Sequence, residues 1–267
     1  MFRRLLAKLG REYVKLGFTL QTDVYKQGDT VQGELRLTGS ATEKQLEYVR
    51  VGLYMTFITM KGREYTKEIA AFFRQENFSV GTDEQQLLPF TYHVPFNLAV
   101  SSTQITYTVR VALKEKGQEE IVQSQLIEII PHVCIGNVID AFVSLDFQKT
   151  PSFGTFTVRV QTFTLIPIGY FTSMLDKVEF TLSWNEKEMT LLLCIFGKND
   201  QKMYHRVMLS HWELEDVEEL AERLRKEITD MCNEPHVYKD KEMLYADEGD
   251  FIGSFVAGLF PEIIFDE

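Results

Sequence analysis

The sequence predicts a mainly β protein, with two antiparallel β-sandwiches followed by a C-terminal α-helix. Apolar and polar residues alternate from about residue 18 to residue 131, and the alternation returns over a shorter stretch that ends at residue 209. Period-two alternation is typical of strands with one buried face. From Ser210 the apolar residues recur instead at helical spacing. A chain of 267 residues is long enough for two core-forming units.

These patterns divide the chain into four parts. The boundary between the two sandwiches lies at residues 131–136, where Pro131 and Gly136 interrupt the alternation. The parts are a basic amphipathic segment at residues 1–16, a first β-sandwich at 17–131, a smaller β-sandwich at 137–209, and a helix with an apolar tail at 210–267.

Four strands can be read directly in the first sandwich, at residues 31–37, 49–57, 90–96 and 105–113. In the first of these, Val31, Leu35 and Leu37 alternate with polar residues. Pro95 marks an edge or a strand end, because proline has no amide hydrogen to donate to a neighbouring strand. Turn-forming residues separate the strands, at 26–29, 38–40, 81–83 and 116–117.

The second sandwich shows four shorter strands, expected at residues 156–160, 178–182, 191–195 and 203–207. The residues at 184–187 and 197–200 are typical of hairpin turns.

The helix is expected to begin at Ser210, because Ser210 and Glu213 have the spacing of a capping box. Pro235 follows the last apolar residue closely, which predicts a helix of about five turns. The apolar residues at helical spacing are Val217, Leu220, Ala221, Leu224, Ile228 and Met231.

Charge and cysteine content limit the classes of function. The formal net charge of −11 argues against a general nucleic-acid-binding protein, which needs many basic residues against phosphates. The three cysteines are widely spaced and odd in number, which favours reduced thiols and a cytoplasmic protein. Arg4 and Lys8 interrupt the apolar residues at the start, so that stretch does not resemble a secretory signal.

The sequence contains no recognisable catalytic or metal-binding motif, so we expect no enzyme activity, cofactor or metal. Cys194 lies in an apolar run and is expected to be an inert buried thiol. Acidic residues at 240–250 offer oxygen ligands for Ca²⁺, but their spacing does not match an EF-hand and favours a solvated linker. A hydrolase that uses these acids with a histidine stays as an alternative. The histidines are scattered, at His93, His132, His205, His211 and His236.

The N-terminal segment is one of two candidate binding segments. Its apolar residues recur at helical spacing among basic residues, a pattern that fits an anionic membrane surface, a groove on a partner or a cap over the protein's own sheet. The residues concerned are Phe2, Arg3, Arg4, Leu5, Leu6, Lys8 and Leu9.

The second candidate segment is the apolar tail at residues 251–265, represented by Phe251, Ile252 and Phe255. It is too short to cross a bilayer. One interpretation is a strand that pairs with an edge of the first sandwich and exposes that edge to a partner when released. The other is static packing.

Residues 23–35 contain the pattern Y-x-x-G-D-x-V-x-G, and this pattern resembles the opening of arrestin-like domains. Residues 88–96 and 107–111 resemble the strands that follow. Among arrestin-like proteins the chain is most similar to the bacterial stage-zero sporulation-control M protein family, over residues 15–210.

The resemblance implies two arrestin-like β-sandwiches and a regulatory adaptor that binds other proteins, in sporulation control or a related programme. A scaffold held at a membrane surface by the N-terminal segment is an alternative. The sequence does not identify the partner or the oligomeric state. Four positions are expected to be fold-determining turn residues, with positive φ at Gly28 and Gly39 and a close approach at Gly33, namely Gly28, Asp29, Gly33 and Gly39.

Overall fold

The computed structural model describes residues 13–238, apart from residues 60, 158–159, 185–187 and 199–200. Contacts divide these residues into two compact units, which are described separately. The first unit runs to Tyr25 and continues through Asp29–Val94 and Thr106–Glu128. The second unit contains Lys26–Gly28, Pro95–Ile105 and the chain from Ile129 onward.

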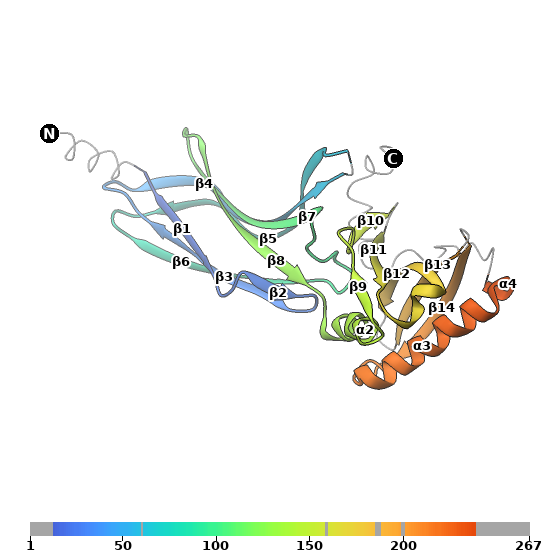
Figure 1. The fold of residues 1–267 in the computed structure, drawn as a ribbon. Helices are drawn as coiled ribbons and strands as arrows, with labels where there is room; N and C mark the ends of the chain where they lie inside the picture. Colours follow the sequence, from blue (N-terminus) through green and yellow to red (C-terminus); the bar gives the residue numbers. More distant parts are fainter. Residues whose placement is uncertain (1–12, 60, 158–159, 185–187, 199–200, 239–267) are drawn as a thin grey trace. The chain divides into compact units, whose positions relative to one another are not determined.

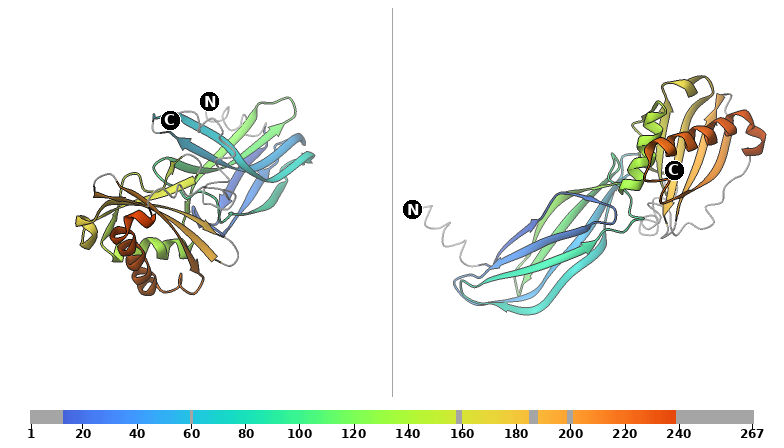
Figure 2. Two further views of the ribbon diagram at one scale, coloured as in Figure 1. Left: turned by 90° about the vertical axis from the view of Figure 1, so that its right-hand side faces the viewer. Right: turned by 90° about the horizontal axis from the view of Figure 1, so that it is seen from below.

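The first unit is a mostly antiparallel β-sandwich of two sheets (Figures 1 and 2). A three-stranded sheet has the order β1-β3-β6, and a five-stranded sheet has the order β2-β8-β7-β4-β5. Phe72 on β5 contacts the rings of Phe90 and Tyr92 on β6, at centroid distances of 5.6 and 5.1 Å. The strands are β1 (Lys15–Leu20), β2 (Val24–Lys26), β3 (Thr30–Thr38), β4 (Lys44–Ile58), β5 (Glu64–Val80), β6 (Gln85–His93), β7 (Ile105–Glu115) and β8 (Glu120–Ile130).

The strands expected in the first sandwich are confirmed as β3, β4, β6 and β7. Val31, Leu35 and Leu37 are buried as the alternation indicated, and β6 ends before Pro95. The longest strand, β5, was not predicted from the sequence. It forms the edge of its sheet, and register shifts at Val51/Gly52 and Leu53/Tyr54 interrupt its pairing with β4, so no simple alternation remains.

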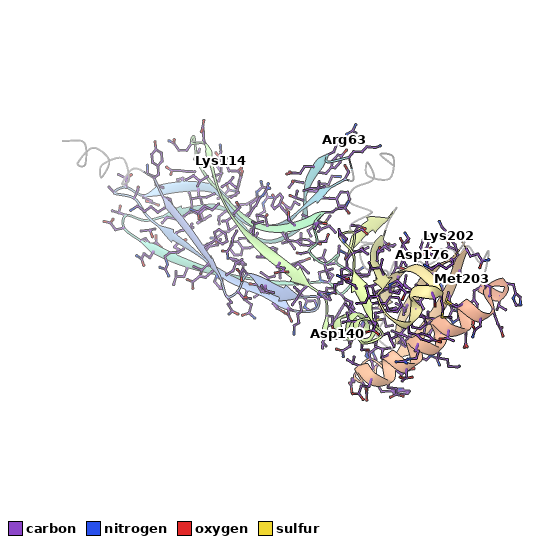
Figure 3. The ribbon with its side chains drawn as sticks, in the orientation of Figure 1. Arg63, Lys114, Asp140, Asp176, Lys202 and Met203 are labelled. Atoms are coloured by element: carbon purple, nitrogen blue, oxygen red, sulfur yellow. The ribbon has the colours of Figure 1, made fainter. Side chains whose placement is uncertain are left out.

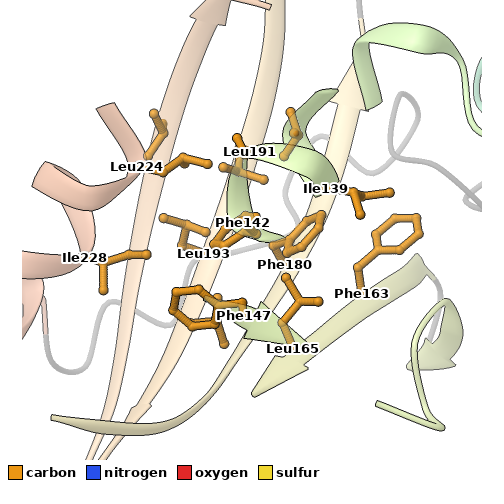
Figure 4. Packing of buried hydrophobic residues seen from close by; sticks show 14 of the residues in the cluster. Ile139, Phe142, Phe147, Phe163, Leu165, Phe180, Leu191, Leu193, Leu224 and Ile228 are labelled. Atoms are coloured by element: carbon orange, nitrogen blue, oxygen red, sulfur yellow. The ribbon is translucent and has the colours of Figure 1, made fainter. Parts of the chain in front are cut away.

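The second unit is a single antiparallel sheet with helices on one face. The sheet order is β10-β11-β12-β13-β14, and β9 also pairs with β11. Figure 4 shows Phe142 of α2 and Leu224 and Ile228 of α3 packed against the sheet. The elements are α2 (Val133–Ser144), β9 (Phe147–Lys149), β10 (Thr155–Thr157), β11 (Val160–Pro167), the 3₁₀ helix η1 (Tyr170–Ser173), β12 (Leu175–Trp184), β13 (Glu188–Gly197), β14 (Lys202–Ser210), α3 (Val217–Asn233) and α4 (Pro235–Tyr238).

The prediction of a mainly β fold with a C-terminal helix is confirmed. In the second unit, however, the layer that covers the sheet consists of α2 and α3, and α2 was not predicted. A short apolar helix cannot be distinguished from a buried strand by periodicity alone. The single strand expected at residues 156–160 is also wrong, because β10 ends at Thr157 and pairs antiparallel with β11, which begins at Val160.

Helix α3 has the predicted length but a different start. It begins at Val217, with Asp216 as its N-cap, rather than at Ser210. The Asp216 carboxylate accepts hydrogen bonds from the amides of Glu218 and Glu219, at 2.9 and 3.1 Å. This satisfies two of the amide groups that a helix start leaves unpaired.

The buried carboxylate of Glu227 links α3 to the sheet. The Glu227 carboxylate lies 3.0 Å from Nε2 of His205 on β14 and 3.0 Å from the guanidinium of Arg223, one turn earlier on α3. The carboxylate is almost fully buried, and a buried charge requires such partners.

The turn glycines have different roles in the structure. Gly28 has the expected positive φ, of 88°. A Cβ at Gly33 would lie 2.3 Å from the Phe90 ring and 2.6 Å from the Thr19 carbonyl oxygen, which agrees with the expected close approach. The positive φ expected at Gly39 is wrong. Glycine is required there because a Cβ would lie 2.0 Å from the carbonyl oxygen of Gly81.

Two buried glutamines tie loop segments of the second unit together. Gln27 donates to the Leu98 carbonyl at 2.6 Å and accepts from the His132 amide at 3.1 Å. Gln161 donates to the carbonyls of Val100 and Gly154, and its oxygen accepts from the Val100 amide. Residues 95–104 are thus held by these side-chain amides and by bonds between Ser101 and Ile129 of β8.

We predict that Gln27→Leu lowers the free energy of unfolding by about 2–4 kcal/mol, because two buried backbone groups lose their partner. Urea unfolding followed by tryptophan fluorescence measures this. Gln118→Leu, at an exposed turn position, is the control and should change stability by less than about 0.5 kcal/mol. Equal effects of the two substitutions would contradict the proposed role of Gln27.

We also predict that Gly33→Ala destabilises the protein by about 1–3 kcal/mol, since the added methyl group meets a backbone oxygen and a buried ring. Gly136→Ala is a matched control, which we expect to stabilise the protein slightly. Its Cβ meets nothing within 4 Å, and alanine in a helix is favoured over glycine by about 0.5–1 kcal/mol. Thermal unfolding of both variants tests the pair, and a neutral Gly33→Ala would contradict the close packing.

Candidate interaction surface

Four rings of the second unit form a cluster, namely Phe96, His132, Trp184 and His211. We call this cluster the aromatic patch, together with Val133 and Trp212, the exposed residues that follow His132 and His211 in the chain. The Phe96 and Trp184 rings stack, with centroids 5.9 Å apart and an interplanar angle of 12°. His132 lies against both rings, at 5.3 and 5.5 Å. His211 contacts Trp184 edge-on at 5.0 Å.

The aromatic patch rests on the turn at Gly28. A Cβ at Gly28 would lie 2.7 Å from the Phe96 ring, so only glycine leaves space for the ring at this place. The neighbouring Gln27 binds the backbone at Leu98 and His132, and so fixes the segments that carry Phe96 and His132. The Y-x-x-G-D turn therefore positions half of the cluster.

His211 and Trp212 of the aromatic patch lie in the turn between β14 and α3. Glu213 accepts hydrogen bonds from the backbone amide and the hydroxyl of Ser210, at 2.9 and 2.5 Å. Asn137 on α2 donates to the Leu214 carbonyl at 2.7 Å. Ser210 and Glu213 are thus bonded as expected, but the Ser210 hydroxyl donates to the Glu213 carboxylate instead of accepting from the Glu213 amide, as it would in a capping box. The pair closes the turn that carries His211 and Trp212 and does not start a helix.

Exposed carboxylates follow the aromatic patch directly along the chain, at Glu215, Asp216, Glu218 and Glu219. Glu215 lies near enough to Cys134 to raise the pKa of that thiol, although burial is the larger cause. Cys134 is the second residue of α2, next to Val133. We call these four carboxylates, which follow Trp212 in the chain, the acidic border of the aromatic patch.

Trp212 is the residue of the aromatic patch that stands out most clearly, with 61% of its surface exposed. Trp184 is partly buried and packs against the core of the second unit. These are the two tryptophans of the whole chain. Tryptophan is enriched among the residues that contribute most to protein–protein binding.

The pKa of Glu213 lies below its ordinary value. Burial acts to raise it, but the two hydrogen bonds from Ser210 and the nearby Arg223 outweigh that effect. A carboxyl group whose pKa is lowered by folding stabilises the folded state above its unfolded pKa, and this contribution is lost as the pH falls through the folded pKa.

The binding segments predicted from sequence cannot be placed. Both lie outside the described residues, and they comprise Phe2, Arg3, Arg4, Leu5, Leu6, Lys8 and Leu9 at one end and Phe251, Ile252 and Phe255 at the other. The acidic stretch 240–250 lies outside them as well.

The histidines expected to be scattered are only partly so, since His132 and His211 meet at Trp184. Within residues 13–238 and their stated gaps, no group of three or more His, Cys, Asp or Glu side chains is placed to hold a metal ion. Burial raises the pKa of Cys194 to about 11, with a smaller contribution from Glu179, so the reactive thiolate form is disfavoured at neutral pH.

Two surfaces of the first unit are less suited to binding. On the five-stranded sheet, Arg50 lies 3.7 Å from both Glu68 and Glu120, so its charge is already balanced. A shallow groove of about 310 Å³ crosses β1, β3 and β6 near Gly33. Its charged lining residue, Glu34, lies 3.7 Å from Arg36.

Comparison with known proteins agrees with this architecture. The family model described as "SpoOM protein" matches residues 2–199. The chain belongs to the SpoOM protein family. A curated member, the sporulation-control protein spo0M of Bacillus subtilis (strain 168), is 26% identical over 256 residues, which cover 87% of this chain and 99% of that protein.

A solved structure supports the fold of this SpoOM family member. The crystal structure of Spo0M, a sporulation control protein from Bacillus subtilis, matches with a TM-score of 0.65 and 26% identity. The match covers 82% of this chain and 98% of the crystallised chain. The expected family is therefore confirmed. Among the helices described for this member, none has the length and apolar character needed to span a membrane.

We predict that Glu213→Ala lowers the free energy of unfolding by about 1 kcal/mol at pH 7, as the loss of a capping carboxylate does. The deficit should disappear as the pH falls below the ordinary carboxyl value of 4.5, because the native carboxyl then becomes protonated too. Glu215→Ala removes an exposed charge from the same turn and is the control. A deficit independent of pH would contradict the role of the ionised carboxylate.

Proposed function

We propose that this protein is a non-catalytic regulatory protein that binds other proteins through the aromatic patch, in sporulation control or a related programme. The observation that carries the proposal is that Phe96, His132, Trp184 and His211 form one partly exposed ring cluster. The exposed Trp212 follows His211 directly in the chain. Membership of a family with a sporulation-control relative supports the regulatory context.

The border of the aromatic patch indicates the chemistry of the partner. An apolar side chain of the partner would pack against Trp212 and Phe96, while its Lys or Arg side chains would face the exposed carboxylates of Glu215, Asp216 and Glu218. Opposite charges at the rim of an interface mainly raise the association rate and the selectivity. The partner is therefore an apolar segment with basic flanks.

A cytoplasmic location belongs to the same proposal. The thiols of Cys134, Cys194 and Cys232 are free, which is usual in a reducing compartment. The membrane-surface scaffold and the hydrolase draw no support from the described residues, because the segments that each requires, residues 2–9 and 240–250, lie outside them.

We predict that Trp212→Ala weakens partner binding by about 2 kcal/mol, or roughly 30-fold in Kd, as expected for a residue that contributes strongly to an interface. Stability should change little, because the side chain is mostly exposed. Affinity capture from native lysate identifies partners of the intact chain, and isothermal calorimetry with the purified partner then compares the variants.

Tyr170→Ala provides a matched control. Tyr170 is an aromatic residue of the same unit, is 68% exposed and lies in η1, outside the aromatic patch. Its removal should leave partner binding unchanged. Equal binding by the Trp212 variant and the intact chain would exclude the patch as the contact surface, and a failure of the intact chain to capture any specific partner would count against the adaptor role.

A further inference from the structure

The sheet of the second unit has a second face, directed away from α2 and α3, which carries alternate residues of β11 to β14. Thr181 pairs with Leu192, and extending the Phe163–Phe180 pair by one residue brings Thr162 beside Thr181. Val160 lies one row further along β11 and clusters with Leu192. Figure 3 labels two consecutive residues of β14 that separate the faces: Met203 belongs to the helix-covered core, and Lys202 lies on the second face.

Burial on the second face is confined to its centre. Val160 is 1% and Leu192 is 8% exposed, and the threonines between them are also buried. On the same face, Met208 of β14 is 55% exposed. Neither Val160 nor Leu192 belongs to the helix-covered core. Met208 lies on the edge strand β14, whereas Leu192 has a strand on each side. Neighbouring strands do not cover the face itself, so the almost complete burial of Val160 and Leu192 indicates a cover over β11 to β13.

A polar atom limits what the cover can be. The hydroxyl of Thr181 is buried and finds no hydrogen-bond partner among the described residues. An unpaired buried hydroxyl costs free energy, so a covering group that can hydrogen-bond is favoured. Polypeptide offers both apolar side chains and backbone hydrogen-bonding groups, whereas a purely apolar ligand does not.

The chain itself carries a segment of matching composition and reach. Helix α4 ends at Tyr238, whose ring lies 5.1 Å from that of His205 on β14. Residues 239–250 follow and span up to about 40 Å when extended. Three strand spacings amount to about 15 Å. Residues 251–260 can therefore reach β11 to β13 of the same unit.

The sequence of residues 251–260 has a bulky side and a small side. Its bulky residues recur in adjacent pairs four residues apart, as on one face of a helix. The remaining positions are Gly, Ser and Ala. The bulky residues are Phe251, Ile252, Phe255, Val256, Leu259 and Phe260.

We propose that residues 251–260 of the same chain dock on the second face, over Val160, Thr181 and Leu192. The bulky side of the segment packs on the apolar centre of the face. The proposal is independent of the partner-binding role of the aromatic patch.

Cys194 provides a direct readout, since it lies on the second face two residues from Leu192 on β13. The experiment measures the rates at which a maleimide labels Cys194 and Cys232 in the full-length chain and in a chain truncated after Asp250, by peptide mass spectrometry. Cys232 is the internal standard, because it packs against the helix-covered core. We expect truncation to accelerate labelling of Cys194 at least tenfold and to leave Cys232 unchanged.

Two adjacent substitutions in the full-length chain keep the test valid if the truncated chain does not fold. Phe255→Asp places a charge on the bulky side and should accelerate labelling of Cys194, whereas Ser254→Asp lies on the small side and should not. An unchanged Cys194 rate in both the truncated chain and the Phe255 variant would overturn the proposal, and so would an equal acceleration at both cysteines. Protection that is lost on dilution would also overturn it, by assigning the cover to a second copy.

Discussion

Gln27 places a side-chain amide in the interior of the second unit, where it donates to the Leu98 carbonyl and accepts from the His132 amide. Its own backbone amide donates to the Ile130 carbonyl at 3.1 Å. Three stretches of chain that are far apart in sequence thus meet at one residue. Loops that lack strand partners still require hydrogen bonds for their buried backbone groups, and a glutamine can supply both a donor and an acceptor.

The aromatic patch follows from this constraint. Phe96 belongs to one of the tied stretches and His132 to another, so their rings meet because Gln27 and Gly28 hold the backbones that carry them. Trp184 and His211 reach the same place from the end of β12 and the turn after β14. Part of the patch lies within residues 2–199, which match the family model, and part lies beyond them.

The two faces of the sheet in the second unit differ in a similar physical way. One face is covered by amphipathic helices whose apolar side chains form a single core with the strands. The other is rich in threonine at its centre, and its outer rows carry charged residues such as Lys177, whose amine lies 4.0 Å from the centre of the Phe196 ring. A mixed face of this kind suits a cover that is partly polar.

The sequence predicted the family and the mainly β fold because strand alternation and turn glycines are local properties. Gly28 and Gly33 were recognised as structural positions for the reasons that the structure shows, while Gly39 was assigned the wrong reason. Helix α2 and the true start of α3 were not predicted, since an apolar helix capped by His132 lacks the usual signals and the Ser210–Glu213 motif also closes a turn.

The sequence by itself determined where strands alternate, where the chain turns and which family it joins, because each depends on neighbouring residues. Only the tertiary structure decided that Phe96, His132, Trp184 and His211 form one cluster and that Gln27 holds it. These residues are distant in sequence, and their association depends on backbone hydrogen bonds that leave no periodic signal. One sequence signal pointed to the cluster: Trp184 ends a strand and Trp212 lies in a turn. A large ring at such a position suggests packing against another segment.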